Sequence, residues 1–229
     1  MVRRAFLRLM VPLVGRTFAV LWWRRSGRTE VRPVVWAMRA WFGSIARMYE
    51  PMARRLAGGS YDGALVSAIC ALQEFGALRG REAADRDGEW ILDACAGSGA
   101  VARQLAETFP AAVIVCADIS GRMLCEVRRR WRPGDGKRPY LVQADATRLP
   151  FRSDIFGVVF LQNAPPYVEE MVRVGLPRAA VALIYTFGAV VPERYETLIA
   201  TKCKHAGLAT VQVVRTGGGA YVIGEKEAK

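Results

Sequence analysis

The 229-residue chain contains one histidine, His205, and five cysteines, none of which form a C-x-x-C pair. A histidine-based metal centre is therefore excluded, and a Ser-His-Asp hydrolase is not favoured. The odd cysteine count indicates neither a disulfide framework nor a zinc site, so we expect a reducing compartment and no metal ion. With 52% hydrophobic and 24% charged residues, the composition is that of a globular protein.

Acidic residues are nearly absent from the N-terminal quarter of the chain. Residues 1–59 hold twelve arginines, no lysine and two glutamates, a net charge of +10, whereas the other 170 residues hold 21 basic and 19 acidic side chains, a net charge of +2. The overall charge of +12 therefore comes mainly from a basic leader. Nucleic acid is not the expected partner, because a domain that holds a phosphate backbone carries a basic footprint of its own.

A long uninterrupted apolar run is also absent. Residues 5–23 are apolar apart from Arg8, Pro12 and Arg16. Each arginine would cost about 2.5–3.5 kcal/mol at the centre of a spanning helix, so a membrane span is not expected. Three interpretations of the leader remain open: an extra helix packed on the body, a peripheral membrane contact through residues 1–30, and a targeting segment. The expected location is the cytoplasm, with peripheral membrane attachment, or the mitochondrion in a eukaryote.

Apolar segments alternate with helical segments over most of the chain. Helices are predicted from Val34 to about Leu78, with breaks at Glu50-Pro51 and at Gly58-Gly59-Ser60, and again over 100–109 and 119–131. The expected strands cover 90–92, 112–117, 140–143, 158–161, 181–185, 210–214 and 220–224. This pattern indicates an α/β fold with a Rossmann-like, seven-stranded and mostly parallel sheet, preceded by N-terminal helices and ending in an antiparallel hairpin.

A loop of small residues follows the first expected strand. The segment Asp93–Gly99 (DACAGSG) leads directly into a predicted helix. In an open α/β sheet, ligands bind at the carboxyl ends of the strands, and a loop without bulky side chains lets a ligand approach the backbone. The loop lacks the Lys-Ser/Thr of a P-loop, and Cys95 stands where a G-x-G-x-x-G fingerprint has its first glycine. It therefore indicates a nucleotide-like cofactor without identifying it.

Two further acids stand at the ends of the next two strands. Asp118 follows Gly99 by nineteen residues, where a carboxylate can accept two hydrogen bonds from a ribose diol. Asp145 ends the third strand, where it can accept a hydrogen bond from an adenine amino group. The alternative is that each aspartate only caps the helix that follows it.

Together these motifs resemble the class I S-adenosylmethionine-dependent methyltransferases, and within them the ubiquinone/menaquinone C-methyltransferase (methyltransferase type 11) branch. Asp93–Gly99 resembles the D-x-x-x-G-[TS]-G of that branch, Asp118–Leu124 its D-x-S-x-x-M-L, and Asp145–Phe151 its D-A-x-x-L-P-F. Upstream, Phe42–Glu50 is similar to F-x-x-I-A-x-x-Y-D, whose tyrosine lies over the cofactor. The resemblance covers the chain from about Phe42 to its C-terminus.

The resemblance implies S-adenosyl-L-methionine as the cofactor. We expect three parts of the chain: a basic amphipathic leader (1–33), indicated by its charge, a helical cap over the active site (34–80) and a cofactor-binding methyltransferase domain (81–229). The residues that it implies for cofactor binding are Tyr49, Asp93, Ala94, Cys95, Ala96, Gly97, Ser98, Gly99, Asp118, Ile119, Met123, Asp145, Ala146 and Gln162.

The acceptor side departs from the pattern of the branch. The Phe-Asp before the fourth strand is Phe156-Gly157, and Leu176–Ala180 replaces Lys-Pro-Gly-Gly before the fifth. Methyl transfer needs aligned reactants, and it needs a general base only if the acceptor must lose a proton. Tyr61, Tyr167 and Glu169 are candidate pocket residues, and no base is assigned.

We expect methyl transfer to a small or lipophilic acceptor, quinone-like or phenolic. One alternative is an N-methyltransferase acting on nucleic acid or protein, because Ala164-Pro165-Pro166-Tyr167 resembles the [DN]-P-P-[YF] motif of such enzymes. Its first position is Ala164, however, which cannot accept a hydrogen bond from an amino group. A second alternative is a non-enzymatic, membrane-associated scaffold, although a scaffold has no use for a complete set of cofactor motifs.

Overall fold

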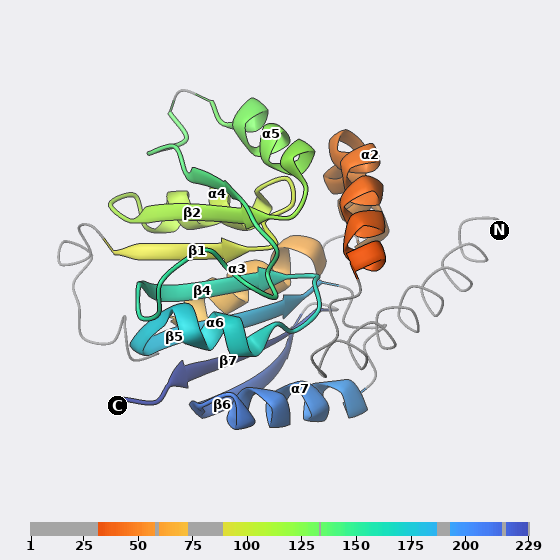
Figure 1. Cartoon of the computed structure of the whole chain (residues 1–229). Helices are drawn as coiled ribbons and strands as arrows, with labels where there is room; N and C mark the ends of the chain where they lie inside the picture. The colour runs from red at the N-terminus through yellow and green to blue at the C-terminus, as the bar shows by residue number, and fades with distance from the viewer. Residues whose placement is uncertain are drawn as a thin grey trace.

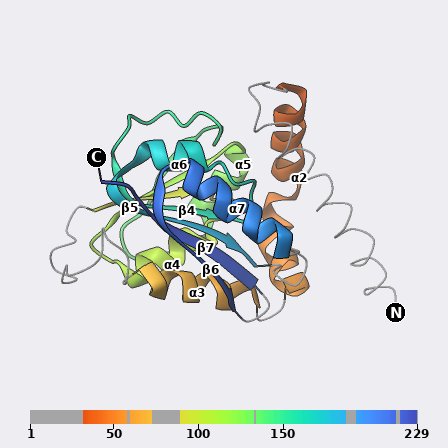
Figure 2. The same cartoon turned by 90° about the horizontal axis from the view of Figure 1, so that it is seen from below.

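The computed structural model describes residues 32–57, 60–72, 89–132, 134–186, 193–216 and 219–228. Within these ranges a single sheet is covered by helices on both faces (Figures 1 and 2). The basic leader lies outside the described residues apart from its last two positions, and so does the polar stretch at 80–88. No helix in the described ranges has the length and apolar character needed to cross a bilayer.

The sheet has seven strands in the order β3-β2-β1-β4-β5-β7-β6. Their bounds are β1 Trp90–Ala94, β2 Val113–Asp118, β3 Tyr140–Gln143, β4 Phe156–Gln162, β5 Gly175–Tyr185, β6 Leu208–Thr216 and β7 Gly219–Lys226. The first five strands are parallel, and β7 runs antiparallel to both β5 and β6. The predicted fold class, including the C-terminal hairpin, is therefore confirmed. Because the strand order reverses between β1 and β4, a crevice is expected at their carboxyl ends.

Helices cover the two faces of the sheet unequally. Their bounds are α2 Arg32–Ala57, α3 Ser60–Leu72, α4 Ala100–Thr108, α5 Gly121–Arg130, α6 Val168–Val174 and α7 Glu193–His205. One core cluster joins the sheet to α3, α4 and α5, and the other joins it to α6 and α7. In β4, Val158 and Phe160 point into the first cluster, while Val159 and Leu161 point into the second. The continuous apolar run of β4 thus reflects burial on both faces.

The predicted break at Glu50-Pro51 is wrong, because α2 continues through Pro51 to Ala57. Proline has no backbone N–H, so the carbonyl of Arg47 loses the donor that a regular helix would supply. Arg130 Nη2 of α5 donates to this carbonyl at 3.4 Å. A tertiary hydrogen bond therefore replaces the missing helical one. The second predicted break falls between the end of α2 and the start of α3 at Ser60.

Strand β5 begins six residues earlier than the apolar pattern predicts, at Gly175. The register between β4 and β5 shifts near Phe156 and Val158, and Arg178 has a φ of +67°. A bulge of this kind admits residues that do not alternate like a regular strand. The irregular start of β5 therefore looked like a loop in the sequence.

Candidate active site

A cavity lies at the carboxyl ends of β1, β2 and β4, beneath α2. In Figure 1 the arrowheads of these strands point toward α2. The predicted cofactor residues that line the cavity are Tyr49, Cys95, Ala96, Gly97, Ser98, Asp118, Ile119, Met123, Asp145, Ala146 and Gln162. Lining residues that were not among the predicted ones include Met38, Phe42, Ala100, Ala144, Asn163, Ala164 and Pro165. The site is thus built by segments from α2 to the end of β4.

Three of the predicted cofactor residues, Asp93, Ala94 and Gly99, do not line the cavity. Asp93 is fully buried, and its Oδ2 accepts a hydrogen bond from the backbone N–H of Ala102 at 3.2 Å, in the first turn of α4. Its Oδ1 is buried and has no hydrogen-bond partner among the described residues. Burial raises the pKa of Asp93 to about 8. Asp93 therefore anchors the glycine loop to α4, and it leaves one buried acceptor unused.

Asp118 lines the cavity and holds the two segments around it. Its Oδ2 accepts from the N–H of Gly97 and its Oδ1 from the N–H of Ser120, both at 2.8 Å. Burial raises its pKa above the ordinary range. Each carboxylate oxygen has a second lone pair, so Asp118 can still accept hydrogen bonds from a diol. Asp145, two residues beyond β3, accepts from the N–H and Oγ1 of Thr147 at 2.9 and 2.8 Å.

The backbone of the glycine loop is left-handed at three positions. Gly97 and Gly99 have φ values of +53° and +83°, and Cys95 has +59°. A Cβ at Gly99 would lie 3.1 Å from both methyl carbons of Val127, so this glycine is also needed for the close approach of α5. Cys95 occupies a conformation that suits glycine better than an L-residue, which is why the fingerprint has a glycine there.

Aromatic side chains of α2 form the roof of the cavity. Tyr49 Cε1 lies 3.8 Å from the position that a Cβ on Gly97 would take. The ring of Phe42 meets that of Tyr49 edge to face, with centroids 6.0 Å apart. Burial, and then the carboxylate of Asp118, raise the pKa of Tyr49 to about 12. Tyr49 is therefore a neutral phenol above the loop, in the place that the resemblance implies.

Glu50, the neighbour of Tyr49, fastens the roof to the loop. It is 3% exposed, and its Oε1 accepts from Arg54 Nε at 3.0 Å and from Arg103 Nη2 at 2.6 Å. Its Oε2 accepts from Ser98 Oγ at 2.9 Å and from Arg130 Nη1. Burial acts to raise the pKa of Glu50, but these partners hold it below the ordinary value. Glu50 was not predicted as a site residue, although it is the sole acid of α2.

The three candidate pocket residues separate in the structure. Tyr61 and Tyr167 line the cavity. Burial raises the pKa of Tyr61. The Cζ atom of Arg54 lies 5.0 Å from the centroid of the Tyr61 ring. Glu169 does not line it, because its carboxylate pairs with Lys202 Nζ at 3.2 Å and its side chain is 63% exposed. In the described part of the chain, no group of metal-ligating side chains is arranged to hold an ion.

In the segment that resembles an amino-group methyltransferase motif, Asn163 is hydrogen-bonded to the residue that follows β5. Asn163, which precedes Ala164, has both ends of its amide engaged with Thr186. Its Nδ2 donates to Thr186 Oγ1 at 2.8 Å, and its Oδ1 accepts from the N–H of Thr186 at 2.9 Å. A shift of Asn163 into the position of Ala164 would break both bonds. These bonds fix the register of the segment, with Ala164, which cannot accept a hydrogen bond, at the first position of the motif.

Comparisons with known proteins agree with this geometry. Residues 91–183 match the family model described as a methyltransferase domain. A malonyl-[acyl-carrier protein] O-methyltransferase of Halorhodospira halophila is 35% identical over 107 residues, which are 43% of this chain and 35% of that protein. A ubiquinone/menaquinone biosynthesis C-methyltransferase of Paracoccus denitrificans is 36% identical over 102 residues, 41% of each chain. The chain thus matches well under half the length of these relatives.

A solved structure shows the same fold. Magnesium protoporphyrin IX methyltransferase from Synechocystis PCC 6803, determined with bound S-adenosylmethionine, superposes with a TM-score of 0.60 at 15% identity. The superposition covers 84% of this chain and 97% of that one. Residues 91–183 thus match a methyltransferase domain, the chain has the fold seen in S-adenosylmethionine-dependent methyltransferases, and its sequence resembles the ubiquinone/menaquinone C-methyltransferase branch.

Proposed function

We propose that this protein transfers the methyl group of S-adenosylmethionine to an uncharged, lipophilic small molecule such as a hydroquinone. The bound cofactor supplies an electrophilic methyl group on a sulfonium. The residues present fit it, since the small side chains of the loop and the left-handed Gly97 allow close approach to the backbone. Asp118 would accept hydrogen bonds from the ribose diol, and Asp145 would accept one from the adenine amino group.

The character of the cavity lining carries the proposal for the acceptor. The apolar and aromatic part of the walls includes Met38, Phe42, Tyr61, Pro165 and Tyr167, and Ser98, Gln162 and Asn163 add uncharged polar groups. No lysine, arginine or histidine is among the described lining residues. A carboxylate or phosphate on the acceptor would lose hydration without gaining a cationic partner there. An apolar ring system would be accommodated without that penalty.

The protonation states favour an acceptor that needs no strong base. Burial raises the pKa of Tyr61, so its hydroxyl stays protonated and can donate a hydrogen bond to an acceptor oxygen. The roof formed by Phe42 and Tyr49 limits the access of water to the reacting atoms. The protein would thus act mainly by alignment and exclusion of water, which suits an electron-rich ring carbon or an acidic phenol.

Calorimetry with S-adenosylmethionine tests the cofactor half of the proposal. Wild type should bind, and Asp118→Asn should weaken binding at least tenfold, because charge-assisted hydrogen bonds to the ribose become neutral ones. Asp154→Asn is the matched control, since Asp154 is half-exposed and pairs with Lys226 on the surface. Absence of binding by the wild type would overturn the assignment of the cofactor.

Turnover with candidate acceptors tests the other half. Prenylated hydroquinones and simple phenols should be methylated, whereas a malonyl thioester and oligonucleotides should not. Preferential methylation of the malonyl thioester or of an oligonucleotide would contradict the proposed acceptor class while leaving the cofactor site intact.

A further inference from the structure

The most exposed large hydrophobic side chains of the described residues lie on α2. Trp36, Met48 and Trp41 are 71%, 69% and 62% exposed, and Met52 is 42% exposed. Single apolar residues at a surface are ordinary, but several of the largest ones on one helix mark an interaction surface.

The exposed charges of the same helix are all positive. Arg39, Arg47 and Arg55 are exposed, and the side chain of Arg47 is 83% exposed. Glu50, the sole acid of the helix, is buried and already paired with three arginines. We call this surface the outer face of α2, made of Trp36, Trp41, Arg47, Met48, Met52 and Arg55.

Within the described residues, the apolar side chains of the outer face remain largely exposed, and Arg47 pairs with Glu126 of α5 at 3.6 Å. The opposite side of α2 carries Phe42 and Tyr49, which line the cavity, and Ala46 and Ala53, which are buried. Residues 41, 48 and 52 are seven and four positions apart, so Trp41, Met48 and Met52 form one stripe along the helix. Their exposure is therefore a property of one continuous face.

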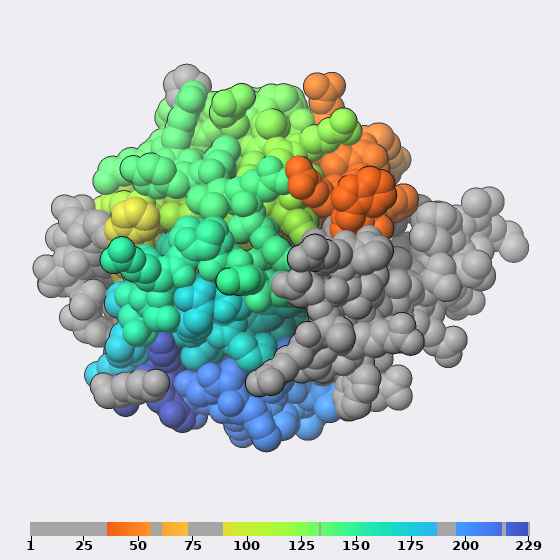
Figure 3. All heavy atoms as spheres, in the orientation of Figure 1, coloured from red at the N-terminus to blue at the C-terminus, as the bar shows by residue number. Residues whose placement is uncertain are grey.

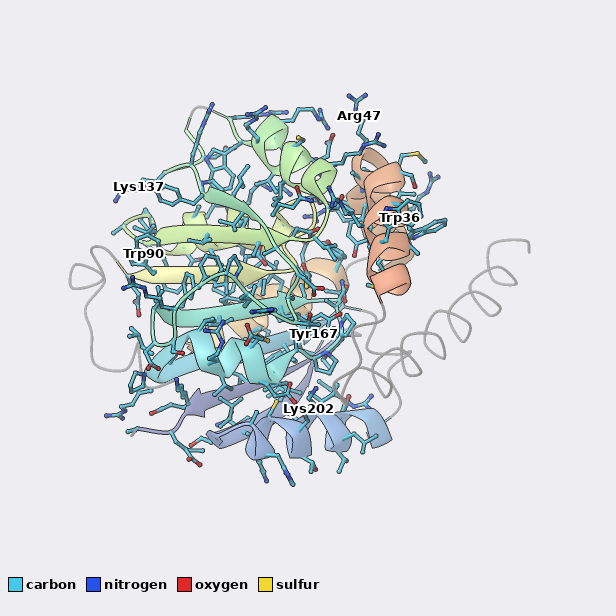
Figure 4. The ribbon with its side chains drawn as sticks, viewed as in Figure 1. Trp36, Arg47, Trp90, Lys137, Tyr167 and Lys202 are labelled. Atoms are coloured by element: carbon cyan, nitrogen blue, oxygen red, sulfur yellow. The ribbon has the colours of Figure 1, made fainter. Side chains whose placement is uncertain are left out.

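Helix α5 extends the positive surface. It packs beside α2, and its last turn carries Arg128 and Arg129, both exposed, followed by exposed Arg132. Glu126, the acid of α5, is 4% exposed. Figure 3 shows α2 and α5 next to each other on the surface, and Figure 4 shows Arg47 at the end of α2 that lies near α5.

We propose that the outer face of α2 binds the surface of a bilayer that contains anionic lipids. Indole rings settle at the level of the headgroups, and arginines are attracted by anionic lipid phosphates. Residues 1–31, which directly precede the helix, contain seven arginines and one glutamate, so they carry charge of the same sign. The bilayer would then lie against the helix whose inner side lines the acceptor cavity.

Other occupants of this face fit less well. A nucleic acid would satisfy the arginines but would leave Met48 and Met52 without an apolar partner. A second copy in a two-fold contact would place the same arginines opposite one another. The proposal goes beyond the methyl-transfer activity and does not depend on the identity of the acceptor.

Vesicle flotation of the full chain tests the proposal. Wild type should float with vesicles of phosphatidylcholine and phosphatidylglycerol, and at least tenfold less with phosphatidylcholine alone. Trp41→Ser/Met48→Ser should lower the partition coefficient at least tenfold. Arg47→Gln/Arg55→Gln should lower it to a similar extent on the anionic vesicles alone.

Matched variants separate the outer face from other surfaces. Leu198→Ser/Val213→Ser removes two apolar side chains from α7 and β6 that are 42% and 39% exposed, and Arg148→Gln/Arg152→Gln removes two exposed arginines elsewhere. Both should float like the wild type. Retained binding of S-adenosylmethionine by Trp41→Ser/Met48→Ser would show that this variant is folded. If the wild type and every variant failed to bind S-adenosylmethionine, the proposed function would be contradicted, and the flotation results would still test the bilayer contact.

Three results would overturn the proposal. The first is equal flotation of Trp41→Ser/Met48→Ser and wild type, with binding lost only in Trp22→Ser/Trp23→Ser; this would assign the lipid contact to the leader. The second is no flotation of the wild type. The third is a wild-type dimer in solution that Trp41→Ser/Met48→Ser converts to a monomer, which would make the face an interface between copies.

Discussion

Ser98 Oγ donates a hydrogen bond to Glu50 Oε2 at 2.9 Å, and this bond joins α2 to the glycine loop. The two residues are 48 positions apart in the chain. Glu50 also accepts hydrogen bonds from Arg103 of α4 and Arg130 of α5, so one carboxylate connects the loop, the roof of the cavity and two further helices. The cofactor loop and the helix over it therefore act as one unit.

Removal of Glu50 should destabilise the fold and weaken cofactor binding together. Glu50→Ala would leave Arg103 and Arg130 without their buried partner, at a cost of about 3–5 kcal/mol in the free energy of unfolding. The pKa of Glu50 is lowered in the folded state, so its contribution is present above its ordinary pKa and is lost as the pH falls below it. Urea unfolding as a function of pH measures the loss of stability and its pH dependence, and calorimetry with S-adenosylmethionine measures the affinity. Glu225→Gln, which alters a surface pair with Arg178, should change little.

Ser98→Ala tests the hydrogen bond between the glycine loop and Glu50 separately from the overall stability of the fold. It removes one hydrogen bond, worth about 0.5–1.5 kcal/mol, and leaves the arginine partners of Glu50 in place. We expect affinity for S-adenosylmethionine to fall several-fold with a small change in Tm. Unchanged affinity would show that the loop holds its shape without Glu50.

Asp93 should make the cofactor-free protein less stable as the pH rises. Its pKa is raised to about 8 from an ordinary value of 3.8, so between these values the folded state binds more protons than the unfolded state. Stability then falls as the pH increases through this window. Asp93→Asn, whose oxygen can still accept from Ala102, should flatten the decline of Tm between pH 5 and pH 8. If Tm of Asp93→Asn fell with pH as steeply as that of the wild type, the raised pKa of Asp93 would be refuted. Asp154→Asn provides the surface control.

Pro51→Ala should stabilise the protein. Alanine restores the N–H that the carbonyl of Arg47 lacks, and it removes the steric conflict of proline within a helix. Because Arg130 already compensates in part, and because proline also restricts the unfolded chain, we expect a net gain of about 1–2 kcal/mol in urea unfolding. Pro177→Ala in β5 should instead be neutral or slightly destabilising. A loss of stability in Pro51→Ala would contradict this account of the helix.

Cys95→Ala should retain turnover and cofactor affinity. Cys95 lies in the loop and lines the cavity, and its role there is to fill space in a left-handed turn. Cys95→Gly relieves a backbone conformation that costs an L-residue about 1–2 kcal/mol, and this gain is offset by lost packing and by a more flexible unfolded chain. Loss of turnover in Cys95→Ala with unchanged cofactor affinity would reveal a chemical role for the thiol.

Much of the fold could be predicted because its signals are local. Apolar runs bounded by turns and helical segments predict strands wherever they occur, and the acids at their ends follow the same short-range pattern. The pattern therefore predicts Asp118 and Asp145 at one edge of the sheet, and both line the cavity there. The start of β5 is not predicted, because a bulge breaks the alternation on which the prediction depends.

The sequence by itself determined the class of fold, the glycine loop and the acids Asp118 and Asp145 that line the cavity. Tertiary structure alone decided that α2 passes through Pro51, that Glu50 joins the roof to the loop, and that Asp93 and Gly99 support the cavity without lining it. Each of these depends on a partner distant in the chain: Arg130 for the Arg47 carbonyl, Ser98 for Glu50, and Val127 for Gly99. Periodicity and spacing report what neighbours along the chain do, whereas a buried ion pair or a close helix approach exists only once distant segments have packed.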